Sequence, residues 1–146
     1  MKKTVLFVCI HNSARSQMAE ALLNRQCPEF FEAESAGLEA GTLNPLVVEA
    51  LAEEGIDIAG KATQETFDMI KAGRQFDYII TVCDAASAER CPLFPGVAQR
   101  LNWNFPDPSQ FIGTHDEKLA RVREVRDAIR AKVEAFCAVH CDAVRV

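Results

Sequence analysis

The chain contains 146 residues, of which 49% are hydrophobic and 25% charged, and this length and composition are typical of a single globular domain spanning residues 1–146. Its 21 acidic and 16 basic residues give a net charge of −5 at pH 7. A nucleic-acid-binding protein would carry a basic surface, so we expect no nucleic-acid partner and infer that any anion site is built from local groups.

The N-terminal residues, MKKTVLFVC, contain an apolar run of about seven residues, which is too short for a signal peptide or for the roughly 20 apolar residues of a membrane helix. We therefore expect a cytoplasmic protein that has no membrane partner. We also expect it to be a monomer. In a cytoplasmic chain, six cysteines indicate reactive, redox-active or metal-binding thiols more often than a framework of structural disulfides.

Hydrophobic periodicity predicts strands that alternate with helices along the chain. Runs of apolar and β-branched residues favour strands, whereas apolar residues at spacings of three and four favour helices. Asn44 and Pro45 mark a helix start, with the proline in the first turn. In chain order we expect a strand over 3–8, a helix over 14–26, a strand over 32–37, helices over 45–54 and 61–73, a strand over 76–82, a proline-containing loop over 84–96, a short strand over 98–102 and a final helix over 116–138.

This alternation predicts an α/β fold in which helices cover both faces of a mostly parallel sheet. Right-handed crossovers and a flavodoxin-like strand order of 2-1-3-4 put the first and third strands side by side. Ligands of such folds bind at the carboxyl ends of the strands, where the order reverses. Cys9 follows the first strand and Cys83 the third. Because neighbouring strands are about 4.8 Å apart, we expect these two thiols to lie within disulfide-bonding reach.

Residues 9–16, CIHNSARS, form a short loop between a buried strand and a helix, with a thiol at its start and the Arg15 guanidinium near its end. Such loops bind phosphate-like anions through backbone N–H groups and the positive end of the helix. The same groups stabilise a thiolate, to which Ser16 can donate a hydrogen bond, and Asn12 suits a left-handed backbone position. The residues expected to bind an oxyanion are Ile10, His11, Asn12, Ser13, Ala14, Arg15 and Ser16.

The stretch VCIHNSARSQMAE, residues 8–20, resembles the arsenate reductases built on the low-molecular-weight protein tyrosine phosphatase fold. In this superfamily the loop cysteine is the nucleophile and the aspartate of an Asp-Pro pair is the general acid, which implies these roles for Cys9 and Asp107. The resemblance covers the whole chain, through Ser35-Ala36-Gly37, Thr81-Val82-Cys83-Asp84, Cys91-Pro92, Trp103, Pro106-Asp107-Pro108 and the final helix.

Two features favour the reductases within this superfamily. The phosphatases typically follow the Asp-Pro pair with tyrosines that recognise phosphotyrosine, whereas this chain has Ser109-Gln110-Phe111. The reductases carry two additional cysteines after the third strand, which Cys83 and Cys91 match. Seven residues separate this pair, one more than in the best-known thioredoxin-coupled members, and we expect the intervening loop to accommodate the extra residue.

The resemblance implies a relay of three thiols with no tightly bound cofactor. Cys9 would attack arsenate, with phosphate and sulfate as competing oxyanions, and Cys83 would then attack Cys9 and release arsenite. Cys91 would attack Cys83, and thioredoxin would reduce the Cys83–Cys91 disulfide, with glutathione or glutaredoxin as the alternative donor. In some relatives a potassium ion supports the loop, and the matching candidate ligand positions are Asn12, Glu20 and Ser35.

Other interpretations remain open at this point. A phosphatase acting on phosphotyrosine or another phosphomonoester needs only Cys9, Arg15 and Asp107, and an oxyanion- or metalloid-binding sensor needs no turnover. Cys27 is expected to be structural. Cys137, His140 and Cys141 share a helix face, but without a fourth ligand we predict no metal site and favour a frayed helix or an incidental disulfide.

Overall fold

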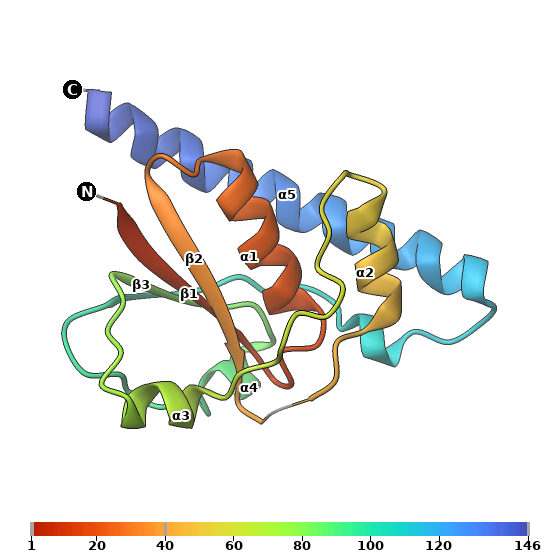
Figure 1. Cartoon of the computed structure of the whole chain (residues 1–146), viewed down its shortest axis with the longest axis horizontal. Helices are drawn as coiled ribbons and strands as arrows, with labels where there is room; N and C mark the ends of the chain where they lie inside the picture. The colour runs from red at the N-terminus through yellow and green to blue at the C-terminus, as the bar shows by residue number, and fades with distance from the viewer. Residues whose placement is uncertain (1, 40, 146) are drawn as a thin grey trace.

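Within residues 2–39 and 41–145, which the computed structural model describes (with the backbone alone for 140–145), four parallel strands form one sheet in the order β2-β1-β3-β4 (Figure 1). The predicted fold class and strand order are confirmed. The strands are β1 (Lys3–Cys9), β2 (Phe31–Gly37), β3 (Tyr78–Thr81) and β4 (Gln99–Asn102). The helices are α1 (Arg15–Gln26), α2 (Pro45–Ala52), α3 (Thr66–Lys71), α4 (Ala85–Ala88), the 3-10 turn η1 (Pro108–Gln110) and α5 (His115–Arg145).

The central strand β1 lies between β2 and β3, and its apolar run is buried because both faces of the sheet are covered. Val8 of β1 pairs with Thr81 of β3, and the Val82 N–H donates a hydrogen bond to the Val8 carbonyl at 2.8 Å. The carboxyl ends of these strands therefore lie side by side. As predicted, this brings Cys9 and Cys83 to the same edge of the sheet.

Side chains of β1 alternate between two hydrophobic clusters, one on each face of the sheet. Val5 and Phe7 belong to the larger cluster, which residues of α1, α2 and α5 complete. Leu6 and Val8 belong to the smaller cluster, together with residues of α3 and of the 91–98 segment. Figure 1 shows α1, α2 and α5 on one side of the sheet and α3 on the other. The two layers of helix hold the rim of the sheet, where β1 and β3 end, in a fixed position.

The predicted elements that differ most from the structure are the helix over 61–73 and the strand over 76–82, both longer than observed. The helix predicted over 61–73 is wrong over its first five residues, because α3 begins only at Thr66. Glu65 instead forms a bridge with Gly37 at the end of β2, and Gln64 bonds the loop after β1. The strand predicted over 76–82 is confined to β3, whose four residues pair with β1. The turn η1 and the short helix α4, which lies within the loop predicted over 84–96, have no counterpart among the predicted elements.

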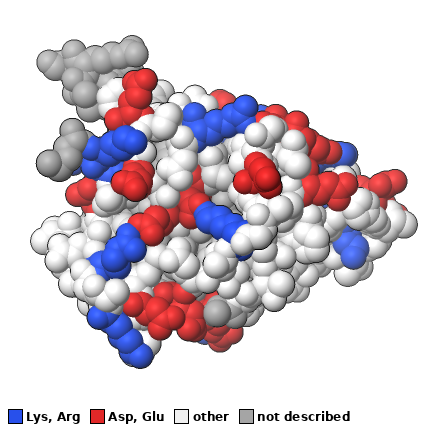
Figure 2. All heavy atoms as spheres, viewed as in Figure 1, with Lys and Arg blue, Asp and Glu red and all other residues white. Residues whose placement is uncertain are grey.

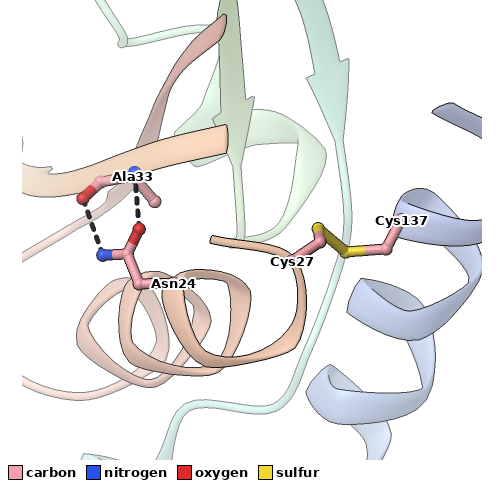
Figure 3. The surroundings of a disulfide bond; sticks show 4 residues. All are labelled: Asn24, Cys27, Ala33 and Cys137. Carbon is pink, nitrogen blue, oxygen red and sulfur yellow. Dashed lines mark hydrogen bonds between the residues drawn. A yellow bond between two sulfur atoms is a disulfide. The ribbon is translucent and has the colours of Figure 1, made fainter. Parts of the chain in front are cut away.

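The outer edge of β2 is held by a side chain of α1 (Figure 3). Asn24 Nδ2 donates to the Ala33 carbonyl at 3.0 Å, and the Ala33 N–H donates to Asn24 Oδ1 at 2.8 Å. Both backbone groups of Ala33 face away from β1, so this amide satisfies them where no strand partner is present.

A disulfide joins Cys27, which follows α1, to Cys137 of α5 (Figure 3). The structural role expected of Cys27 is confirmed, whereas the expectation against structural disulfides is wrong for this pair. The two cysteines are 110 residues apart in sequence, and only the packing of α1 against α5 brings them together. Because α1 begins at the Cys9 loop, the bond anchors the far end of the helix that supports this loop.

Acidic and basic side chains are interspersed on the face of the molecule that Figure 2 shows. This face therefore has no extended field of one sign, and an anion must be bound by groups close to it. No helix in the described part of the chain is long and apolar enough to cross a membrane.

Reduction of the Cys27–Cys137 disulfide is expected to destabilise the fold. Because the bond closes a long loop in the unfolded chain, the Cys27→Ser/Cys137→Ser variant should lose about 2–4 kcal/mol of unfolding free energy. Guanidinium denaturation followed by circular dichroism measures the loss. With a reductant present, the unfolding free energy of the wild type should fall to that of the variant. Equal unfolding free energies of the wild type and the variant without reductant would contradict this role of the disulfide.

Candidate active site

The loop between β1 and α1 lies tightly against the segment that follows β2. A Cβ atom added at Gly37 would be 2.6 Å from the Asn12 nitrogen, and one added at Gly41 would be 2.8 Å from the His11 carbonyl oxygen. Such distances are below any van der Waals contact, so only glycine fits at these positions without displacing the loop backbone. The end of β2 and Gly41 thus pack directly against the backbone of the loop.

The backbone of the loop turns its carbonyl groups outward. The Cys9 and Ile10 carbonyls accept hydrogen bonds from the two residues after β2 at 3.0 and 2.9 Å, and the Ser13 carbonyl accepts one from the Asn44 N–H at 2.9 Å. In a planar trans peptide, the N–H points opposite to the carbonyl. The N–H groups that follow these carbonyls therefore face the interior of the loop. There they form an oxyanion cradle, a set of backbone donors that can bind an oxyanion.

Cys9 lies at the start of this cradle, with its sulfur 2.9 Å from Ser16 Oγ. Asn12 Nδ2 donates to Ser16 Oγ at 2.8 Å, which leaves the Ser16 hydroxyl hydrogen available to donate to the sulfur. Asn12 has a φ of 56°, the left-handed conformation predicted for it. Because α1 begins at Arg15, the Cys9 sulfur lies near a hydroxyl, a cation and the positive end of a helix, which are the surroundings of a nucleophilic cysteine.

Arg15 and Asp107 lie next to one another although 92 positions separate them in sequence. Arg15 Nη2 is 3.6 Å from Asp107 Oδ2, and Nη1 donates to the Phe105 carbonyl at 3.1 Å. Asp107 caps η1 by accepting a hydrogen bond from the Ser109 N–H at 3.0 Å. The guanidinium is buried, whereas the carboxyl is partly exposed. This geometry sets an acid beside the cation that would hold an oxyanion, as general acid catalysis requires.

The two cysteines of the predicted relay, Cys83 and Cys91, flank the short helix α4, and both are free and buried. Burial raises the pKa of the Cys83 thiol to about 11 and also raises the pKa of Cys91. Arg15 of the loop lowers the pKa of Cys83 and Cys9 raises it, both by smaller amounts than burial, so Cys83 lies near the loop. Cys91 nevertheless belongs to the smaller hydrophobic cluster, on the opposite face of the sheet from the cluster of Cys9. Both thiols are protonated at rest, and Cys91 must leave its cluster to react.

The three candidate potassium ligands are already bonded to groups of the chain. Ser35 Oγ donates to Glu20 Oε1 at 2.9 Å, Lys61 forms an ion pair with the other oxygen of Glu20, and the Gln64 N–H donates to Asn12 Oδ1 at 2.9 Å. Burial lowers the pKa of Lys61 to about 8. Because this pKa is still above 7, the amine is mainly charged at pH 7. Potassium is bound by cages of oxygen atoms, so this set of residues, in which an ammonium already pairs with Glu20, does not fit the ion.

The side chain of His11 and the cysteine Cys137 take no part in this site. His11 is exposed, and its Nδ1 lies 3.7 Å from Glu39 Oε2. Cys137 is bound in the disulfide, and the side chains of His140 and Cys141 lie outside the described residues. Among the residues that the structure does describe, no group of three or more candidate metal ligands occurs.

Sequence reasoning missed three polar residues that hold the loop from behind. Gln17, Lys61 and Gln64 all contact the loop or α1, and Gln17 is fully buried although it lies in the first turn of a helix. Spacing gives no signal for Lys61 and Gln64, because they reach the loop through the fold. Gln17 could have been found from the sequence, because it is a polar residue at a position where the helical period predicts an apolar one.

Comparison with known proteins agrees with the site. The sequence pattern of the low molecular weight phosphotyrosine protein phosphatases matches residues 4–144. The chain belongs to this family. The chain is similar to an arsenate reductase of Bacillus licheniformis. The two are 40% identical over 137 residues, which cover 92% of this chain and 95% of that protein.

Solved structures of arsenate reductases are also similar to this chain. The crystal structure of an arsenate reductase from Archaeoglobus fulgidus is 35% identical, with a TM-score of 0.64 over 88% of this chain and 98% of that one. A thioredoxin-dependent arsenate reductase of Corynebacterium glutamicum is 29% identical, with a TM-score of 0.60 over 92% of this chain and 63% of that one. The family resemblance identified from sequence is confirmed.

Ser16 is expected to control the reactivity of Cys9 in this phosphatase-family loop. The Ser16→Ala variant removes the hydroxyl next to the sulfur, and its Cys9 should be alkylated by iodoacetamide about tenfold more slowly at pH 7. Peptide mass spectrometry measures the rate at Cys9 alone. Ser109→Ala, which removes an exposed hydroxyl and keeps its backbone N–H, is the matched control. Equal rates in Ser16→Ala and the wild type would show that the hydrogen bond does not act on the thiolate.

Proposed function

We propose that this family member is a cytoplasmic, single-domain arsenate reductase in which Cys9, Cys83 and Cys91 react in turn. The observation that carries the proposal is a second free thiol, Cys83, beside the oxyanion loop of Cys9, with a third free thiol, Cys91, at the other end of α4. A phosphatase of this fold has use for only one of them. The relatives named arsenate reductase support the same assignment.

In the first step the Cys9 thiolate attacks the arsenic atom of arsenate held in the loop. The inward-facing N–H groups and the Arg15 guanidinium bind the remaining oxygens and stabilise the developing negative charge. Asp107, 3.6 Å from Arg15, protonates the departing oxygen, which leaves as water. The product is a covalent adduct between the Cys9 sulfur and arsenic(V).

In the second step Cys83 attacks the sulfur of this adduct. A disulfide forms between Cys9 and Cys83, the sulfur–arsenic bond breaks, and its electron pair reduces arsenic(V) to arsenic(III), which leaves as arsenite. Cys83 must lose its proton first, and at rest burial keeps the pKa of its thiol at about 11. The thiol is therefore held unreactive until the 84–91 segment rearranges.

In the third step Cys91 attacks Cys83 and frees the Cys9 thiolate for another cycle. Because Cys91 is buried on the opposite face of the sheet, α4 must unwind to bring it to Cys83. The oxidised pair then lies in the surface segment around α4, where an external dithiol can reduce it. We propose thioredoxin as that dithiol, in keeping with the thioredoxin-dependent relative.

A phosphatase is the second candidate, and one observation favours it. A cavity of ≈ 600 Å³ lies between the start of α2 and η1, lined in part by Asn44, Pro108 and Phe111. It adjoins the loop through Asn44 and the acid through Pro108, and it offers room for the organic group of a phosphomonoester. Such hydrolysis would need Cys9, Arg15 and Asp107 but neither of the other thiols.

Thiol variants separate these two functions. Arsenate-dependent NADPH oxidation in the presence of thioredoxin and thioredoxin reductase should fall by about a hundredfold or more in Cys83→Ser and in Cys91→Ser, because each removes a nucleophile. Hydrolysis of p-nitrophenyl phosphate by the same two variants is the internal control and should be unchanged, whereas Cys9→Ser should lose both reactions. Full arsenate reduction by Cys83→Ser would rule out the relay, and turnover with a glutathione system alone would replace the proposed donor.

A further inference from the structure

Residues 61–64 lie behind the Cys9 loop and bond it from outside. Lys61 forms an ion pair with Glu20 of α1, and the Gln64 N–H donates to Asn12 Oδ1 at 2.9 Å. We propose that the Lys61 ammonium is a built-in cation of this loop, which takes the place of a bound potassium ion and makes the reactivity of the loop independent of that ion. The inference rests on the proposed function only in taking Cys9 as the reacting thiol.

Glu20 needs a cation because its carboxylate is buried, with 8% of the residue exposed. A buried charge without a partner is costly, and removal of one member of such a pair destabilises the other. Ser35 Oγ satisfies one carboxylate oxygen at 2.9 Å, and the Lys61 ammonium pairs with the other. The Lys61 side chain is 30% exposed, so its apolar stem reaches inward from the surface to deliver the charge.

A chain of hydrogen bonds connects this ion pair to the reacting sulfur. Gln64 Nε2 donates to the carbonyl of Ser35 at 3.1 Å, and the Gln64 N–H donates to Asn12 Oδ1. Asn12 Nδ2 donates to Ser16 Oγ at 2.8 Å, and Ser16 Oγ lies 2.9 Å from the Cys9 sulfur. The cation at the acidic end of this chain is therefore a positioning residue for the loop.

The surroundings of Gln17 support the same conclusion. Its Nε2 lies among three oxygens, the Asn12 carbonyl and Oδ1 at 3.1 Å each and the Ala62 carbonyl at 3.4 Å. Its Oε1 is buried without a hydrogen-bond partner in the described part of the chain. Turning the amide over would set this oxygen against the three others, so the nitrogen stays where it is. The oxygens that would otherwise suit a cation are thus held by a nitrogen of the chain itself.

The test follows Cys9 rather than turnover. The rate of Cys9 alkylation by iodoacetamide is measured by peptide mass spectrometry from pH 5 to 9, in potassium, sodium or N-methylglucamine chloride of equal ionic strength. The wild type should give the same profile in all three salts. Lys61→Gln should react between about threefold and thirtyfold more slowly at pH 7, with its profile shifted to higher pH, and Lys61→Arg should restore the wild-type profile.

Two further variants keep the proposal falsifiable. Lys3→Gln, which removes an exposed lysine at the start of β1, should behave as the wild type. Glu20→Gln/Lys61→Gln should react faster than Lys61→Gln alone, because it removes the carboxylate that requires the cation. Where Lys61→Gln does not fold, folding of Glu20→Gln/Lys61→Gln is the expected result, and failure of both variants to fold would contradict the pairing. Stimulation of the wild type by potassium alone, or an unchanged profile in Lys61→Gln, would overturn the proposal. Absence of arsenate reduction with the expected alkylation profiles would count against the proposed function and not against this inference.

Discussion

The parallel pairing of β1 with β3 is the constraint on which the chemistry depends. It aligns Val8 with Thr81, so both strands end at the same rim of the sheet, one leading into Cys9 and the other into Cys83. Parallel strands in this order require crossover helices on both faces, and α1 begins at the same rim with its positive end toward the loop. An anion cradle and a second thiol therefore come together without a long insertion.

The cradle and the relay have opposite electrostatic requirements. Cys9 must attack the bound oxyanion, and inward N–H groups, Ser16 and Arg15 surround its sulfur with positive and hydrogen-bonding groups. Cys83 must stay protonated until the adduct has formed, and burial raises the pKa of its thiol. In the proposed relay, the burial of the second thiol and the position of Cys91 in a separate hydrophobic cluster would prevent premature attack.

The strand–loop–helix sequence around Cys9 predicted the cradle because all of its parts are local: a buried strand, Asn12 in the left-handed region and a helix that starts at Arg15. The family resemblance supplied Asp107, which only the fold brings next to Arg15. The Cys27–Cys137 bond could not be predicted, because helix packing determines it. Local periodicity predicted a helix over residues 61–65. It could not show that Gln64 bonds the loop and that Glu65 forms a bridge with the end of β2, because both contacts depend on the fold.

The order in which the thiols react distinguishes the proposed relay from other mechanisms, and one experiment measures that order directly. Reduced protein is treated with one equivalent of arsenate, quenched by alkylation and digested, and its disulfides are mapped by mass spectrometry. The wild type should contain Cys83–Cys91, and the Cys91→Ser variant should accumulate Cys9–Cys83, each formed in proportion to the arsenite released. Arsenite release without a bond to Cys83, or a direct Cys9–Cys91 bond in the wild type, would contradict the relay.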